Sequence, residues 1–182
     1  MDGVAQVISD NKIPLGAWGK IAVDWITANF EWFFDAISVG LLVPIEASVD
    51  LLLLTPPLLL IAIIAGIAYL LQRSWWLVLF VVFGLLLILN QGLWEAMLET
   101  LVLIIFATLV SLLIGIPIGI LAARRPWLYR FLSPILDMMQ TIPTFVYLVP
   151  VLILFGLGLV PGIVATVVFA VPGPIRVPYL GI

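Results

Sequence analysis

Residues 134–150 read Pro134-Ile-Leu-Asp-Met-Met-Gln-Thr-Ile-Pro-Thr-Phe-Val-Tyr-Leu-Val-Pro150. They open a run without charged side chains, residues 138–175, that is too long for one membrane crossing. Five polar side chains in this stretch are spaced so that a single helix would present them on one face: Asp137, Gln140, Thr141, Thr144 and Tyr147. Polar groups at membrane depth are costly and are usually kept for a function.

The composition is that of an integral membrane protein. Of the 182 residues, 65% are hydrophobic and only 9% are charged, whereas a soluble domain has about 25% charged residues. The chain has neither cysteine nor histidine, so it lacks thiolate metal ligands and the usual general base. Glu95 and Glu99 lie one helical turn apart but mark the edge of an apolar run, and no phosphate-binding loop motif is present. We therefore expect a protein that is not an enzyme and binds no metal.

Apolar runs and turn signals predict an all-α fold of two regions. Residues 1–50 form an N-terminal tail with an amphipathic helix over residues 18–40, which ends at Pro44. This helix either lies in the lipid headgroup region or packs on the protein's own membrane domain. Residues 51–182 form a transmembrane domain of about five helices, expected at residues 51–72, 75–90, 96–123, 131–155 and 162–176.

The charges predict an orientation for these five helices. Residues 51–182 hold five arginines, and all fall on one side if the helices alternate in direction: Arg73, Arg124, Arg125, Arg130 and Arg176. By the positive-inside rule that side is cytoplasmic. The N-terminal tail, which is acidic, then lies outside.

Two further patterns predict helix contacts and helix breaks. Small residues recur every four positions and would let another helix approach closely: Ala107, Ser111, Gly115, Gly119 and Ala123. Prolines predict breaks at Pro117, Pro143 and Pro150.

The polar stretch has two interpretations. Asp137 either pairs with Arg130 or caps a helix, or it belongs to a functional face. Gln140, Thr141 and Thr144 either satisfy one another and the nearby backbone, or line a pathway or a subunit contact.

Several segments resemble the permease subunit of glycine betaine/proline-type ABC importers. The similarity runs from about Trp18 to Ile182 and is most specific in residues 134–150; the other similar segments are residues 90–95, 114–120, 155–162 and 169–172. The resemblance implies the type I ABC importer permease fold. It also implies a homodimer in a bacterial or archaeal cytoplasmic membrane, with the N-terminus outside.

The resemblance also implies partners and a substrate class. Two cytoplasmic ATPase subunits would bind ATP and Mg²⁺, an extracytoplasmic protein or fused domain would bind the substrate, and this chain would bind no cofactor. Substrates would be compatible solutes such as glycine betaine, proline betaine or other quaternary amines. Phe145 and Tyr147 are candidates for contact with such cations.

Relatives continue beyond the position of Ile182 into a cytoplasmic coupling helix, so we expect a partial permease. Two other functions are compatible with the sequence. One is a structural or regulatory membrane subunit without its own transport path, and the other is the permease of a related amino-acid ABC importer.

Overall fold

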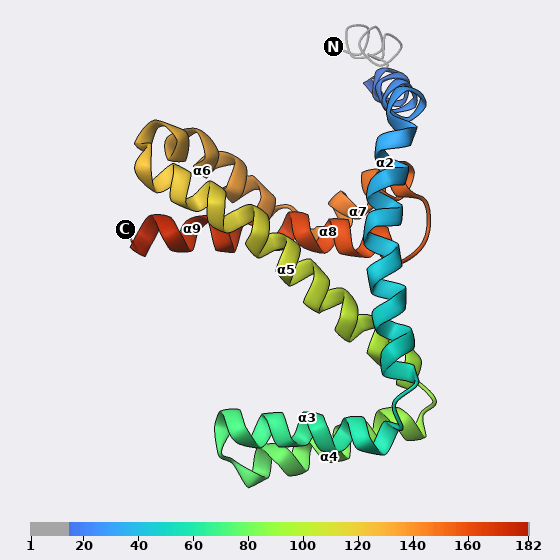
Figure 1. The fold of residues 1–182 in the computed structure, drawn as a ribbon. Helices are drawn as coiled ribbons and strands as arrows, with labels where there is room; N and C mark the ends of the chain where they lie inside the picture. The colour runs from blue at the N-terminus through green and yellow to red at the C-terminus, as the bar shows by residue number, and fades with distance from the viewer. Residues whose placement is uncertain (1–14, 182) are drawn as a thin grey trace, which may run out of the picture. The chain divides into compact units, whose positions relative to one another are not determined.

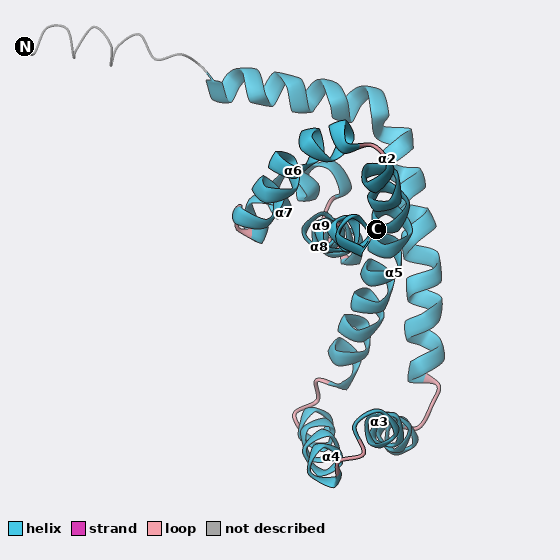
Figure 2. Cartoon of the chain, turned by 90° about the vertical axis from the view of Figure 1, so that its left-hand side faces the viewer, coloured by secondary structure: helices cyan, strands magenta, loops and turns pink. Residues whose placement is uncertain are grey.

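The computed structural model describes residues 15–181, and the regular structure of this part is helical (Figure 2). One compact unit ends at Ile37 and the second begins at Ser38, whereas we expected the boundary after residue 50. The N-terminal tail before residue 15 lies outside the described residues. The helices are labelled in Figure 1, and their bounds are α2 Leu15–Leu53, α3 Pro57–Gln72, α4 Trp75–Asn90, α5 Trp94–Arg124, α6 Pro126–Thr141, α7 Thr144–Phe155, α8 Leu159–Ala170 and α9 Pro172–Gly181.

The helix α2 differs from the amphipathic helix that we expected. It contains a kink at Phe30, whose φ of −119° and ψ of 17° are not helical. The expected end at Pro44 is wrong, because α2 continues to Leu53. Proline removes one backbone donor from a helix, and here the hydroxyl of Ser48 donates to the carbonyl of Pro44 at 2.6 Å.

Fewer helices than expected are long enough to cross a membrane. Among the described residues, three have the necessary length and composition: Gly16–Leu53, Trp94–Arg124 and Leu159–Tyr179. The bent pair α6 and α7 makes a fourth if it is counted as one span. The first two expected spans correspond to α3 and α4, which have sixteen residues each. Such a helix is about 24 Å long, short of a hydrocarbon core of about 30 Å.

The helix α5 is the central element of the second unit. Its buried side chains Val102 and Ala107 meet Ile45 and Val49 of α2 and Ile163 of α8 in one apolar cluster. Farther along, α5 lies against α9, as both ribbon views show (Figures 1 and 2). The burial of these apolar surfaces fixes α2, α5 and α8 together.

Two of the small residues of α5, Gly115 and Gly119, lie at the contact with α9. Ala107, Ser111, Gly115 and Gly119 are buried, and Ala123 is partly exposed. A Cβ atom on Gly115 would lie 2.5 Å from Cβ of Pro174, and one on Gly119 would lie 2.5 Å from the carbonyl oxygen of Ile175. Only glycine permits this separation of the two backbones.

The expected breaks at Pro117 and Pro150 do not occur, since α5 and α7 continue through these prolines. Apolar helices tolerate an internal proline where neighbouring groups compensate for the missing hydrogen bond. Pro143 differs, because α6 has ended before it and α7 begins after it.

We predict that Gly119→Ala destabilises the protein by about 1–3 kcal/mol, because the added methyl group forces α9 away from α5. Thermal unfolding of the purified protein in detergent would measure the change. The matched control is Gly84→Ala in α4, where a Cβ atom meets nothing within 4 Å. Because alanine favours helices more than glycine does, the control should be neutral or slightly stabilising. Equal Tm values for the two variants would contradict a close contact at Gly119.

Candidate functional site

The polar stretch at residues 134–150 is divided between two helices. The axes of α6 and α7 are bent by 96° at the break between Thr141 and Thr144. Ile142 has an extended backbone, with φ −75° and ψ 129°. A residue before proline is disfavoured in the helical region, and Pro143 itself has no N–H group to donate. This dipeptide therefore ends α6 and starts α7 in a new direction.

The bend shows that the prediction of a single polar helix face is wrong. Asp137, Gln140 and Thr141 lie on α6, whereas Thr144, Phe145 and Tyr147 lie on α7. The spacing rule assumed an unbroken helix, and the turn at Ile142–Pro143 removes that assumption.

Two of the predicted polar side chains bind the backbone at the bend. The hydroxyl of Thr141 and the hydroxyl of Tyr147 each donate to the carbonyl oxygen of Met138 at 3.2 Å. The amide of Ile142 donates to the same oxygen at 3.0 Å. Tyr147 reaches back from α7 to α6, so its hydrogen bond holds the two helices at their angle.

Asp137 forms an ion pair with Arg176 of α9, and not with Arg130 as we considered. The Asp137 side chain is 59% exposed and that of Arg176 29% exposed, and exposed pairs contribute little stability. The rings of Tyr129 on α6 and Tyr179 on α9 stack nearly parallel, with centroids 3.5 Å apart. Sequence reasoning missed these contacts because the partners are far apart in the chain.

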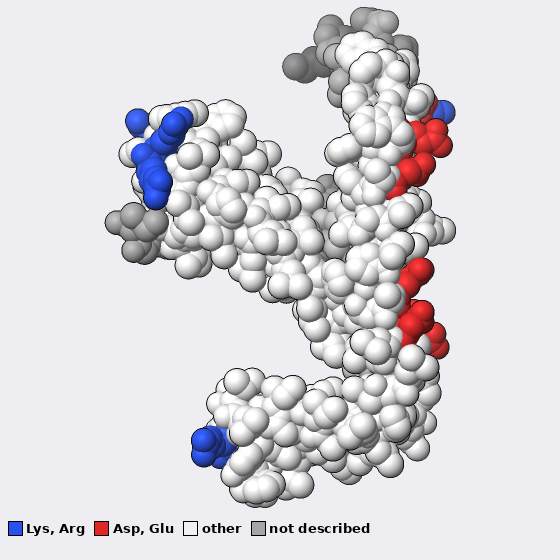
Figure 3. Space-filling view, viewed as in Figure 1, with Lys and Arg blue, Asp and Glu red and all other residues white. Residues whose placement is uncertain are grey.

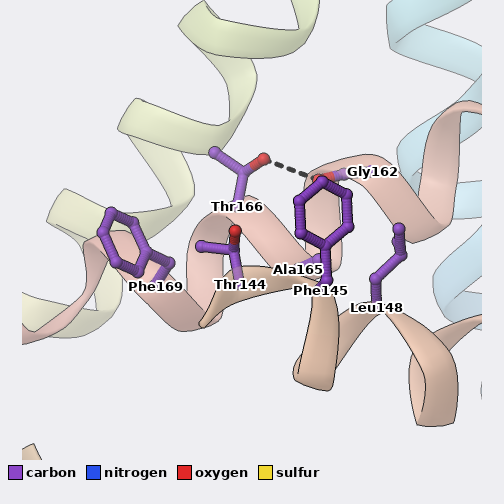
Figure 4. Close-up of a pocket in the computed structure, with 7 residues that line it drawn as sticks. All are labelled: Thr144, Phe145, Leu148, Gly162, Ala165, Thr166 and Phe169. Carbon is purple, nitrogen blue, oxygen red and sulfur yellow. Dashed lines mark hydrogen bonds between the residues drawn. The ribbon is translucent and has the colours of Figure 1, made fainter. Parts of the chain in front are cut away.

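A cavity of about 290 Å³ lies between α7 and α8. Thr144, Phe145 and Leu148 line it from α7, and Gly162, Thr166 and Phe169 line it from α8. In Figure 4 the two threonines lie between the two phenylalanine rings. The hydroxyl of Thr166 donates to the carbonyl of Gly162 at 2.7 Å. Of the predicted site residues, Thr144 and Phe145 line this cavity, whereas Asp137, Gln140, Thr141 and Tyr147 do not.

Four carboxylates line a separate cleft of about 220 Å³. Glu46 and Asp50 come from α2, and Glu95 and Glu99 come from the start of α5. No group of side chains in the described part of the chain is arranged to hold a metal ion.

Arg124 lies in the last turn of α5, so this helix is acidic at one end and basic at the other (Figure 3). Both charges are placed favourably for the helix dipole.

Comparison with known proteins identifies a domain and close relatives. Residues 115–182 match the family of the binding-protein-dependent transport system inner membrane component. The chain is 43% identical over 176 residues to the glycine betaine transport system permease protein OpuAB of Bacillus subtilis, and 40% identical over 173 residues to the glycine betaine/carnitine transport permease protein GbuB of Listeria monocytogenes.

A third relative, the glycine betaine/proline betaine transport system permease protein ProW of Escherichia coli, is 39% identical over 176 residues. Each alignment covers 93–94% of this chain. The chain spans 60% of OpuAB, 61% of GbuB and 48% of ProW.

We predict that spin labels at Phe131→Cys in α6 and Ile153→Cys in α7 lie about 20 Å apart, because of the bend. A straight helix would separate these positions by about 33 Å. The distance would be measured by double electron–electron resonance. Because the chain has no cysteine of its own, spin labels attach only at these two introduced positions. Combining Thr141→Val with Tyr147→Phe should broaden the distribution of distances between the two spin labels, since the carbonyl of Met138 loses two hydrogen-bond donors.

Pro150→Ala is the control for this measurement, because α7 continues through residue 150 and the distance should not change. A separation near 33 Å in the unaltered sequence would contradict the bend.

Proposed function

We propose that this chain, whose residues 115–182 match the inner membrane component of binding-protein-dependent transport systems, is the membrane-spanning subunit of an ATP-driven importer for glycine betaine and related compatible solutes. The similarity to glycine betaine permeases over most of the chain is the observation on which the proposal rests. Accumulation of such solutes would protect the cell against osmotic stress.

The proposed type of transporter implies further subunits. We infer that two copies of the permease associate in the membrane and that a separate ATPase on the cytoplasmic side binds ATP and Mg²⁺. A substrate-binding protein or fused domain delivers the solute from outside. The name of the matching family, which refers to a binding protein, supports the substrate-binding partner.

The solute path is proposed to pass the junction of α6 and α7. Gln140 and Thr144 lie on either side of the Ile142–Pro143 break. Backbone outside regular helices is tolerated at membrane depth where it is buried in protein or lines a water-filled space. Asp137, Thr141 and Tyr147 are engaged in contacts that hold α6, α7 and α9, so we assign them a supporting role.

The charge distribution supports an orientation. The four carboxylates of the acidic cleft gather at the start of α5, and Arg124 and Arg125 follow at its other end. Arginine-rich segments remain on the cytoplasmic side. We propose that the end of α5 and the start of α6 face the cytoplasm and that the acidic cleft, which includes Glu46 and Asp50 near the end of α2, faces outward.

We expect the full-length permease, reconstituted with its ATPase and binding protein, to take up glycine betaine only when ATP is present. Combining Gln140→Ala with Thr144→Ala should lower the uptake rate about two- to tenfold, the effect of losing one or two hydrogen bonds to the solute. The matched control combines Gln91→Ala with Thr108→Ala, two polar residues away from the junction.

Three results would count against the proposal. Preferential uptake of an amino acid over glycine betaine would favour a different substrate class. Failure to associate with any ATPase would favour a structural subunit. Equal rates in the two double variants would remove the junction from the solute path.

For the orientation, we predict that a membrane-impermeant maleimide labels Leu157→Cys on intact cells. Trp127→Cys, close to the arginine cluster, should be labelled only after the cells are permeabilised. Both side chains are exposed, and the absence of native cysteine keeps the background low. Labelling of both positions from the same side would indicate that α6 and α7 form a re-entrant loop and do not cross the membrane.

A further inference from the structure

The cavity between α7 and α8 has an unusual combination of lining groups. The rings of Phe145 and Phe169 and the side chains of Thr144 and Thr166 border it, and none of its lining residues is charged. Its volume of about 290 Å³ is at the lower end of the range for small-molecule sites, about 300–1,000 Å³. The cavity is therefore suited to a small solute.

The chemistry of the two rings favours a cation whose charge is shielded by methyl groups. The face of a phenylalanine ring is electron-rich and attracts ammonium groups, and quaternary ammonium ions are the ligands that aromatic cages recognise. A cation with a tightly bound hydration shell would lose more hydration free energy on entering the cavity than a methylated amine would, because the lining offers few polar groups to replace the water. A lining of this composition would therefore favour methylated amines over simple cations.

The start of α7 offers a complementary group for the anionic end of such a solute. Thr144 is the first residue of this helix and borders the cavity. The amide of Val146 in this turn donates to the carbonyl of Pro143 at 2.9 Å, and the first turn of a helix forms its positive end. A carboxylate near Thr144 would therefore lie in a favourable field while the ammonium group lies against a ring that borders the cavity.

The backbone before Thr144 indicates what this side of α7 faces. Thr144 directly follows the non-helical residues Ile142 and Pro143. Backbone of this kind is not tolerated against lipid, so this side of α7 faces protein or water. A charged solute can reach such a place without crossing hydrocarbon.

We propose that the cavity between α7 and α8 is a transit site for zwitterionic solutes, with the quaternary ammonium group against the rings of Phe145 and Phe169 that border the cavity and the carboxylate directed to the first turn of α7. The solute class rests on the proposed function. The site and the two rings are assigned from the cavity itself.

The test replaces each ring by fluorinated phenylalanine, which keeps the shape but weakens the charge on the ring face. Binding of glycine betaine to the purified full-length permease, without binding protein, is followed by saturation transfer to its methyl protons. Fluorination at Phe145 or Phe169 should weaken binding about two- to fivefold at each ring. Fluorination at Phe80, an exposed residue of α4, is the control and should change nothing.

A second arm uses 3,3-dimethylbutanoate, which has the shape of glycine betaine but carries carbon in place of the charged nitrogen. This compound should fail to compete. Equal competition, unchanged affinity after fluorination of both rings, or no binding of glycine betaine to the permease would each overturn the transit site. These outcomes differ from loss of ATP-driven uptake by the complete importer, which would contradict the proposed function.

Discussion

The close approach of α5 and α9 is the constraint on which the rest of the second unit depends. Gly115 and Gly119 let the backbone around Pro174 and Ile175 come within contact of α5. Once α9 is placed, its Arg176 and Tyr179 meet Asp137 and Tyr129, and these contacts position α6. The helix α8 leads into α9 and forms one wall of the cavity whose other wall is α7. The separation of two backbones thus sets the geometry of the candidate site.

Local sequence rules predicted the features that depend on neighbouring residues. The break at Pro143 follows from the steric effect of proline on Ile142, and the four-residue spacing of small side chains placed Gly115 and Gly119 on one face of a helix. Both patterns act over one or two turns. The all-helical nature of the chain follows in the same way from long apolar runs.

Predictions from the sequence were wrong or incomplete where contacts between distant residues determine the structure. Asp137 pairs with a residue 39 positions away, and Arg130, though nearer in sequence, is not its partner. Pro44 was expected to end a helix, but α2 continues through it to Leu53. Thr166 and Phe169 were not selected as site residues because they lie in an apolar helix, and only the packing of α8 against α7 brings them to the cavity.

The glycine surface of α5 also has a consequence for biosynthesis. About 60 residues separate Gly115 from Pro174. At a synthesis rate of about 5–20 residues per second, Pro174 of α9 is therefore synthesised roughly 3–12 s after Gly115 of α5. During this time the groove at Gly115 and Gly119 faces lipid or the insertion machinery, and another helix with small residues could occupy it. The order in which the ribosome delivers α5 and α9 therefore leaves a period in which this chain can mispair, and rapid delivery of the later helices would shorten it.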